Sequence, residues 1–255
     1  MRPAGANRGH QIALYLTADH PCSYLEGMQA RTLFVDPLAP MDRHTYQALV
    51  DQGFRRSGSH VYRPACRDCS RCVPVRIPVA AFTPNRSQRR SWRRNLDLIQ
   101  VLDTPSRVDP EHFELYLRYL LARHPDGNMA EDQSVESYRR FLVEPWGGET
   151  RFLELRQAHR LIGVAVTDLL PKGLSAVYTF FDPDLSDQGL GTFSVLAQIE
   201  IARRLRLPHV YLGYWIGESP KMSYKDRYRP IETFDGVQWR RFQRGEPLCG
   251  GMGHP

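Results

Sequence analysis

The sequence lacks any stretch typical of a membrane anchor or a secretion signal. No run approaches the roughly 18 apolar residues of a membrane-spanning helix, and the first residues, MRPAGANRGHQIALYL, lack the apolar core of a signal peptide. The chain also contains no internal repeat and no low-complexity block. We therefore expect a cytosolic globular protein, whose 255 residues allow one large hydrophobic core or two modest ones.

Cysteine is also scarce. The chain has five cysteines, an odd number, and Cys66, Cys69 and Cys72 follow a C-x2-C-x2-C pattern, so a disulfide framework is not expected. Three thiolates at this spacing can converge on one metal, and Cys22 is the natural fourth ligand of a zinc site or an iron–sulfur cluster. Alternatively, the thiols pack as small hydrophobes or form a redox-sensitive site without metal. We expect no role for Cys249, which lies in a glycine-rich tail.

Positive charge exceeds negative charge, and much of the excess is local. The chain has 34 Lys and Arg against 28 Asp and Glu, a net charge of +6 and a pI near 9.2, which favours a polyanionic partner. We expect NRSQRRSWRRN to form a short helix capped by Asn85. Its arginines, which suit bidentate phosphate contacts unless they are only a solvated face, are Arg86, Arg89, Arg90, Arg93 and Arg94. Trp92 can stack on a base or anchor the helix, and we favour anchoring.

The C-terminal half has the pattern of an acyltransferase core. From Thr150 the apolar period is two, in RFLEL, LIGVAVTDLL and LSAVYTFF, which predicts an antiparallel meander. A glycine loop, a helix over 190–205 and a strand over 209–215 follow. Strand, glycine loop, helix and strand form the core unit of the N-acetyltransferase (GNAT) type of fold. We therefore predict a mixed α+β or α/β fold with a GNAT-like core and a smaller, cysteine-containing α+β region before it.

The glycine loop is a candidate phosphate site. The backbone N–H groups of a first helical turn have no intrahelical acceptors and point toward an anion. The loop residues that would contact the donor are Gln188, Gly189 and Gly191. The simpler interpretation is a plain turn.

The composition shift near residue 108 predicts a domain boundary. We expect a flexible segment over 1–11, an N-terminal domain over 12–107, a catalytic domain over 108–245 and a disordered tail over 246–255. The predicted helices are 41–51, 111–124 and 134–143, besides the two described above. The predicted strands of the flanking regions are 12–16, 30–35, 54–62, 73–82, 96–101 and 231–240.

A second basic patch follows the last core strand, in GESPKMSYKDRYRP. Its position at the carboxyl ends of the core strands favours substrate binding over a solvated loop. Its cations are Lys221, Lys225, Arg227 and Arg229, and Tyr224 lies among them.

Several stretches together resemble the aminoacyl-tRNA–protein transferase family, which includes the arginyltransferases. They are CSYLEGMQARTLFVDP, YQALVDQGFRRSGSHVYRPACRDCSRCVPVRIPVAAFTPNRSQRRSWRRN, VYTFFDPDLSDQGLGTFSVLAQIEIARRL and YLGYWIGESPKMSYKDRYRPIE. The compact length and the C-x2-C-x2-C form are similar to its bacterial branch, the aspartate/glutamate leucyltransferases. The resemblance implies transfer of leucine from leucyl-tRNA to proteins that begin with Asp or Glu, which marks them for N-degron degradation. It also implies zinc or an iron–sulfur cluster at the cysteines, although the chemistry requires no cofactor. No DNA or membrane partner is expected.

The implied reaction is aminolysis of an ester, which needs positioning and a neutral amine. Asp182 or Asp184 is the candidate that orients the amine or accepts its proton, unless Asp182-Pro183-Asp184 is only a turn. Tyr178, Tyr214 and Tyr224 are candidate donors to the oxyanion or packing residues. The four cations of the second patch are candidates for the acidic acceptor.

Other functions fit the same patterns. An arginyltransferase or a coenzyme A-dependent N-acetyltransferase would use the same scaffold, and a non-catalytic RNA-binding protein would use the cysteines and the basic helix. The transferase interpretation makes one structural demand: cations from both halves of the chain must meet at a cleft beside a splayed sheet.

Overall fold

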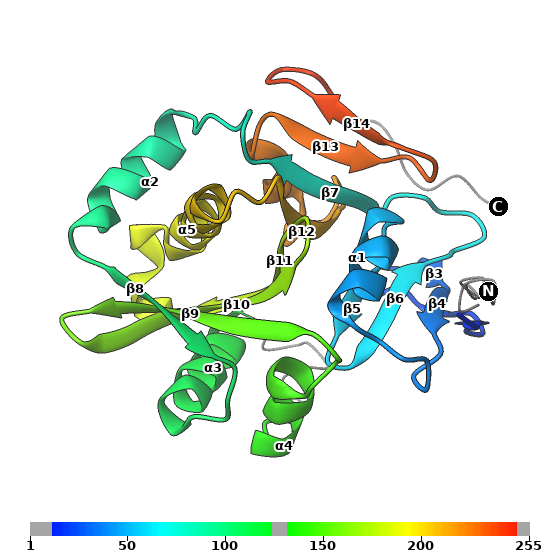
Figure 1. The fold of residues 1–255 in the computed structure, drawn as a ribbon, viewed down its shortest axis with the longest axis horizontal. Helices are drawn as coiled ribbons and strands as arrows, with labels where there is room; N and C mark the ends of the chain where they lie inside the picture. The colour runs from blue at the N-terminus through cyan, green and yellow to red at the C-terminus, as the bar shows by residue number, and fades with distance from the viewer. Residues whose placement is uncertain (1–11, 124–131, 249–255) are drawn as a thin grey trace, which may run out of the picture.

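The computed structural model describes residues 12–123 and 132–248, which form a mixed α/β fold around an eight-stranded sheet (Figure 1). The elements before residue 108 are β1 (Leu14–Leu16), β2 (His20–Pro21), β3 (Gln29–Ala30), β4 (Thr32–Val35), α1 (Arg43–Asp51), β5 (Arg55–Ser57), β6 (His60–Pro64), β7 (Val73–Pro78), α2 (Arg86–Leu96) and β8 (Gln100–Pro105). The elements after it are α3 (Pro110–Arg123), α4 (Val135–Tyr138) with a π-helical turn (Arg139–Val143), β9 (Glu149–Gln157), β10 (Arg160–Leu170), β11 (Gly173–Phe181), a 3₁₀ turn (Pro183–Gln188), α5 (Leu190–Arg204), β12 (His209–Trp215), a second 3₁₀ turn (Ser223–Arg227), β13 (Ile231–Phe234) and β14 (Trp239–Phe242).

The large sheet has the strand order β14-β13-β7-β12-β11-β10-β9-β8. Strands β9, β10 and β11 form the predicted antiparallel meander, and α5 and β12 follow as predicted. Strand β12 pairs with β11 in parallel and with β7 antiparallel, so the sheet is mixed. The predicted boundary at residue 108 falls between β8 and α3, and strands from both sides of it share this sheet.

Helices cover both faces of the sheet (Figure 1). Helices α2 and α5 lie on one face, where Val195, Leu196 and Ile199 pack against apolar side chains of β7 and β12. Helices α1 and α3 lie on the opposite face. The small sheet, of order β1-β4-β6-β5, lies beside α1. Among the described residues, no helix combines the length and apolar character needed to cross a bilayer.

Side-chain caps explain where two helices begin. The carboxylate of Asp42 accepts hydrogen bonds from the N–H groups of His44 and Thr45, which starts α1 two residues later than predicted. The predicted cap Asn85 is confirmed: it accepts from the N–H of Gln88, whose side chain accepts from the N–H of Asn85. This reciprocal capping box compensates for the lack of an apolar stripe in the arginine-rich helix.

Several predicted elements were wrong in extent. The strand predicted over 96–101 is instead β8, because α2 continues to Leu96. The strand predicted over 231–240 is the hairpin of β13 and β14, because Asp235 accepts from two backbone N–H groups and Gly236 has a φ of +100°. The helix predicted over 134–143 is α4 and a π-helical turn. The segment 1–11 and Cys249 lie outside the described residues, whereas Leu248 of the tail packs against the core.

A buried ion pair joins the small sheet to the large one. Arg56 of β5 is 2% exposed, and its Nε and Nη2 each lie 2.6 Å from a carboxylate oxygen of Asp168 on β10. Thr150 donates to the same carboxylate over 2.7 Å, and the Arg56 guanidinium lies 5.3 Å from the ring of Trp146. Every partner of the charge is thus supplied by the protein, which offsets the cost of burying it.

Replacing Asp168 with Asn should destabilise the protein strongly, because Arg56 would remain buried without a counter-ion. We expect the free energy of unfolding in urea to fall by about 3–5 kcal/mol. The matched control is Glu200→Gln, which removes two exposed pairs on α5, with Arg203 and Arg204, and should cost at most about 1 kcal/mol. Equal losses in the two variants would contradict the structural importance of the buried pair.

Glu232 on β13 forms a cluster of ion pairs near the β14 edge of the sheet. It is 6% exposed and accepts from Nε of Arg76 over 2.7 Å and from Nη2 of Arg241 over 2.9 Å, while His209 lies 3.5 Å away. Burial alone would raise the pKa of Glu232, but the hydrogen bonds from His209, Arg76 and Arg241 lower it to about 2. Because the folded-state pKa is depressed, the stability that Glu232 contributes is present above its ordinary pKa and is lost as the pH falls toward about 2.

Glu232→Gln should therefore flatten the acid limb of the stability curve. The difference in unfolding free energy between wild type and variant should shrink by about 3 kcal/mol between about pH 5 and pH 2. Urea unfolding at a series of pH values measures it. Parallel curves for the two proteins would show that Glu232 titrates normally.

Candidate active site

The sheet opens between β11 and β12. The parallel pairing of these strands covers only Gly173 to Ser175 opposite His209 to Tyr211, although β11 continues to Phe181 and β12 to Trp215. The pairing of β12 with β7 shifts register between Tyr211 and Gly213, and Gly213 has a φ of +71°. This bulge turns β12 away from β11, so the two strands part beyond Ser175. We call this point the fork.

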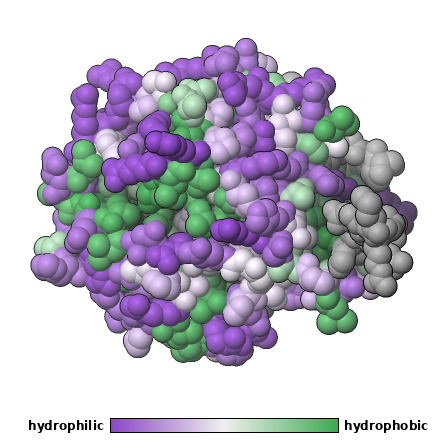
Figure 2. Space-filling model, in the orientation of Figure 1, coloured by the Kyte–Doolittle hydropathy of each residue, from purple (hydrophilic) through white to green (hydrophobic). Residues whose placement is uncertain are grey.

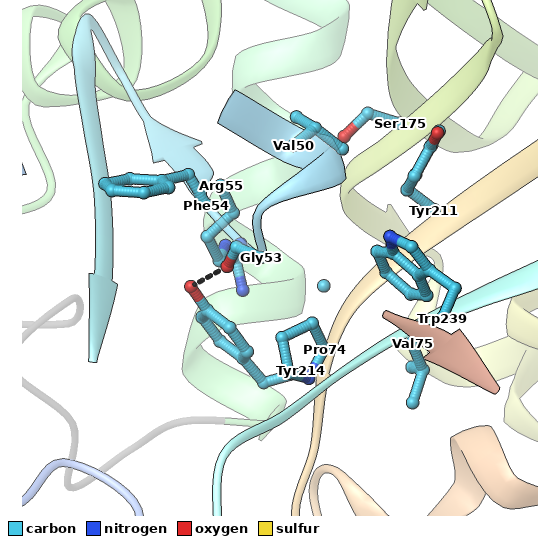
Figure 3. Close-up of a pocket in the computed structure, with 11 residues that line it drawn as sticks. Val50, Gly53, Phe54, Arg55, Pro74, Val75, Ser175, Tyr211, Tyr214 and Trp239 are labelled. Carbon is cyan, nitrogen blue, oxygen red and sulfur yellow. Dashed lines mark hydrogen bonds between the residues drawn. The ribbon is translucent and has the colours of Figure 1, made fainter. Parts of the chain in front are cut away.

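A small cavity lies at the fork. Its volume is about 20 Å³, which is room for one water molecule, and its lining includes Arg55, Ser175 and Gly213. The phenol of Tyr214, which also lines it, donates to the carbonyl of Gly53 over 2.9 Å (Figure 3). Tyr214, a predicted oxyanion donor, therefore connects β12 to the chain after α1.

Arg55 enters the fork from the small sheet. Its Nη2 lies 3.5 Å from the carbonyl oxygen of Val177 on β11, and a Cβ on Gly213 of β12 would lie 3.2 Å from its Nη1. Charge interactions with the phenols of Tyr62, Tyr24 and Tyr214, the first being the largest, outweigh burial and raise the pKa of Arg55. Among the described residues Arg55 forms no ion pair. Sequence reasoning missed this residue, because nothing in the GFRRSG segment distinguishes Arg55 from Arg56.

The predicted acids are placed differently from one another. Asp182 is fully buried, and its carboxylate forms ion pairs with Arg118, over 3.2 Å, and Arg160. It also accepts from the N–H of the exposed Asp184 over 3.2 Å and so caps the 3₁₀ turn. The interpretation of Asp182-Pro183-Asp184 as a turn therefore fits the geometry better than a role for Asp182 as a base.

Tyr178 lies among aromatic side chains. The rings of Tyr116, Tyr119 and Phe141 contact it edge-on, at centroid distances of 6.2, 6.3 and 5.2 Å. Its buried hydroxyl has no hydrogen-bond partner within the described ranges, and burial, followed by Tyr119 and Tyr116, raises its pKa. The hydroxyl is thus a protonated donor that is not engaged elsewhere.

Two of the four cations predicted to bind the acceptor, Lys225 and Arg229, donate hydrogen bonds to backbone carbonyls instead. Lys225 is 5% exposed and donates to the carbonyl of Tyr214 over 2.5 Å; burial, and then the charge of Arg55, lower its pKa well below the usual value. Arg229 donates to the carbonyls of Gln243 and Glu246, over 3.0 and 2.9 Å, and to that of Asp226 over 2.7 Å. Lys225 and Arg229 therefore connect their own loop to neighbouring segments of the backbone. Lys221, Arg227 and Tyr224 are exposed.

The arginine-rich helix lies against the glycine loop. The side chains of Asn95 and Ser91 donate to the carbonyls of Gln188 and Gly189, over 3.0 and 3.3 Å, and Arg94 pairs with Asp187 over 3.2 Å. The ring of Trp92 lies 5.2 Å from that of Phe193 on α5, which confirms the predicted anchoring role. Gly189 has a φ of +70°, and a Cβ there would lie 3.2 Å from Oγ of Ser91, so any side chain at this position would be strained and crowded. The two segments predicted to bind tRNA are thus neighbours.

Arginines dominate the exposed surface of α2, and one of them, Arg94, also pairs with Asp187 before the glycine loop. The solvent-exposed side chains of α2 include those of Arg86, Arg89, Arg90, Arg93 and Arg94. Within the described ranges, Arg86, Arg90 and Arg93 form no ion pair. The amides of Gln88 and Asn85 donate to the carbonyl of Arg227, over 3.1 and 3.4 Å, so α2 also contacts the second basic patch. Figure 2 shows hydrophilic side chains bordering an apolar area over α5 on this side of the molecule.

The four predicted metal ligands gather without forming a site. Cys22, Cys66, Cys69 and Cys72 are half-buried, and burial, followed by the charges of the other three, raises the pKa of Cys72 to about 12. Yet no three cysteine, histidine or acidic side chains in the described parts of the chain are arranged to hold a metal ion. A zinc or iron–sulfur site at these four cysteines therefore stays a prediction.

Comparisons with known proteins match both the N-terminal and the C-terminal part of the chain. The description "Arginine-tRNA-protein transferase, C terminus" matches residues 111–235, and its N-terminal counterpart matches residues 20–90. Similar proteins named aspartate/glutamate leucyltransferase occur in Saccharophagus degradans (49% identical; 91% of this chain and 98% of that one) and Pseudomonas fluorescens (51% identical; 90% and 96%). Another, in Stenotrophomonas maltophilia, is 50% identical over 92% of this chain and 95% of that one.

Two solved structures show a partial, low-scoring similarity to this chain. One is the C-terminal domain of a putative lysylphosphatidylglycerol synthetase from Agrobacterium fabrum, with a TM-score of 0.41 and 14% identity over 57% of this chain and 46% of that one. The other is L-PGS from Bacillus licheniformis, with a TM-score of 0.46 and 10% identity over 69% and 61%. The sequence matches, which span both halves of the chain, show that this protein belongs to the arginine-tRNA-protein transferase family.

Proposed function

We propose that this protein moves leucine from leucyl-tRNA to the N-terminal amine of proteins that begin with Asp or Glu. The observation that carries the proposal is the similarity, at 49% and 51% identity over at least 90% of the chain, to proteins named aspartate/glutamate leucyltransferase. The new N-terminal leucine would mark the acceptor for degradation by the N-degron route. Charged tRNA and such acceptors meet in the cytoplasm, where we place the protein.

The chemistry is a balanced aminolysis. The acceptor amine attacks the ester carbonyl of leucyl-tRNA, a C–N bond forms, the C–O bond to the terminal ribose breaks, and the ribose hydroxyl leaves with the proton of the amine. An α-amine has a pKa of about 7.7–8.0, so a useful fraction is neutral near pH 7.5 without a strong base. Positioning is then the main task of the protein. The free hydroxyl of Tyr178 is the proposed donor to the developing oxyanion.

The proposed tRNA-binding surface combines α2 with the start of α5. Arg86, Arg90 and Arg93 have no acidic partners among the described residues, and their helix contacts the loop before α5, whose first N–H groups lack intrahelical acceptors. These features suit the phosphates of a tRNA acceptor end. The meander, the glycine loop, α5 and β12 support a GNAT-like core, in which the donor ester would lie at the fork.

Transfer of arginine is the second candidate, because the family description names arginine. The charge at the fork argues against it. Arg55 is a cation without a carboxylate partner among the described residues, and it would repel an arginyl side chain bound beside it.

A transfer assay tests the proposed function. We expect the wild-type protein to move labelled leucine from leucyl-tRNA to peptides that begin with Asp or Glu, and to move neither arginine from arginyl-tRNA nor acetyl from acetyl-coenzyme A. Peptides blocked by N-terminal acetylation are the control, because they lack the nucleophilic amine. Transfer of arginine alone would favour the second candidate, and tRNA binding without transfer would favour an RNA-binding protein.

Removing charge from α2 should weaken tRNA binding. We expect the double variant Arg90→Ala, Arg93→Ala to raise the Kd for leucyl-tRNA, and to reduce the slope of log Kd against log salt by about 1 for each lost phosphate contact. The control is Arg43→Ala, an exposed arginine on α1. Filter binding at a series of salt concentrations measures both. An unchanged slope would remove α2 from the interface.

A further inference from the structure

Arg55 is held at the fork by both strands. Its guanidinium lies against the carbonyl of Val177 on β11, at 3.5 Å, and over Gly213 of β12, where a side chain would displace it. It also lies 6.0 Å from the centroid of the Tyr214 ring. Ser175 and Gly213 line the same small cavity as Arg55, and Figure 3 shows Ser175 and Arg55 around it. The cation is therefore fixed at the point where the strands part.

The surroundings of Arg55 differ from those of other shielded arginines in the fold. Arg56 is paired with Asp168, and Arg76 is paired with Glu232. Arg55, which is only partly exposed, faces the phenols of Tyr62 and Tyr24 and has no carboxylate partner within the described ranges. A shielded guanidinium is stabilised when an anion completes its hydrogen bonds. Arg55 is thus a shielded cation that lacks an anionic partner within the described ranges.

The remaining cations near β12 are less suited to complete such a pair. Lys225 and Arg229 donate to backbone carbonyls, and Arg227 and Lys221 are exposed beyond the end of β12. In an N-terminal Asp or Glu, only a few bonds separate the side-chain carboxylate from the α-amine. The cation that recognises this carboxylate must therefore lie beside the reacting ester. Given the proposed function, on which this step rests, that place is the fork.

We infer that Arg55 forms the acceptor carboxylate site: its guanidinium binds the side-chain carboxylate of an N-terminal Asp or Glu at the point where β11 and β12 part. Tyr62 and Tyr24 border this site, and Gly213 leaves the space that the guanidinium occupies. Specificity for acidic acceptors then comes from the small N-terminal sheet, whereas the donor ester lies at the strands of the fork and its tRNA phosphates lie on α2 and the start of α5.

The test compares acceptors that differ only in charge. Leucine transfer to matched peptides that begin with Glu or Gln is measured for the wild type, Arg55→Gln, Arg55→Lys and the surface control Arg43→Gln. In Arg55→Gln we expect kcat/KM for the Glu peptide to fall about 10- to 100-fold, while the value for the Gln peptide changes little, so the preference for Glu is lost. Arg55→Lys, which keeps the charge, should retain part of the preference, and Arg43→Gln all of it. The Kd for leucyl-tRNA should be the same in all four proteins.

An equal loss on both peptides, or an unchanged preference in Arg55→Gln, would overturn the inference. Urea unfolding of each variant separates these outcomes from loss of the fold. If Arg55→Gln does not fold, Arg55→Lys decides the question. Because lysine cannot form the bidentate contact, the ratio of kcat/KM for the Glu peptide to that for the Gln peptide must be lower in Arg55→Lys than in the wild type. If the wild type transfers leucine to neither peptide, the proposed function fails and the inference with it. If it transfers to Glu and the variants keep its preference, only the assignment of Arg55 fails.

Discussion

The buried pair between Arg56 and Asp168 is the interaction on which the arrangement of the two halves depends. It fixes β5 of the small sheet against β10 of the large one, at 2.6 Å and without access to water. Because Arg55 and Arg56 are adjacent in a strand, their side chains point to opposite sides. Fixing Arg56 in the core therefore directs Arg55 into the fork. A structural ion pair on one side of β5 thus positions an unpaired cation on the other.

A second constraint comes from the bulge at Gly213. Strand β12 pairs regularly with β11 only as far as Tyr211, and the positive φ of Gly213 turns the strand so that the sheet opens. Helix α5 begins beside Phe181, at the end of β11, after the loop that α2 contacts through Ser91 and Asn95. Donor phosphates on α2 and an acceptor at the fork would then share one region of the molecule, which the proposed transfer requires.

Much of the fold could be predicted from the sequence, because its signals are local. Alternating apolar residues define the meander, Asn85 defines the start of α2, and the spacing of Leu190, Phe193 and Leu196 defines α5. The ends of β8 and the break between β13 and β14 could not be predicted, because they depend on where α2 stops and on one turn at Asp235. The basic helix and the glycine loop could be picked out from the sequence, but the partners of their side chains depend on tertiary contacts. Lys225 and Arg229 lie in a basic segment typical of a binding site, but in the structure they donate to backbone carbonyls. Arg55, by contrast, lies at the fork, although nothing in the sequence around it distinguishes it.

The most direct test of this account is a crystal structure of the protein with a non-hydrolysable leucyl-adenosine analogue and a peptide that begins with Glu. The account predicts the leucyl group and the peptide N-terminus together at the fork between β11 and β12, with the Glu carboxylate on the guanidinium of Arg55. Binding of the peptide at a distance from the fork, or with its carboxylate on a cation of the second basic patch, would contradict it.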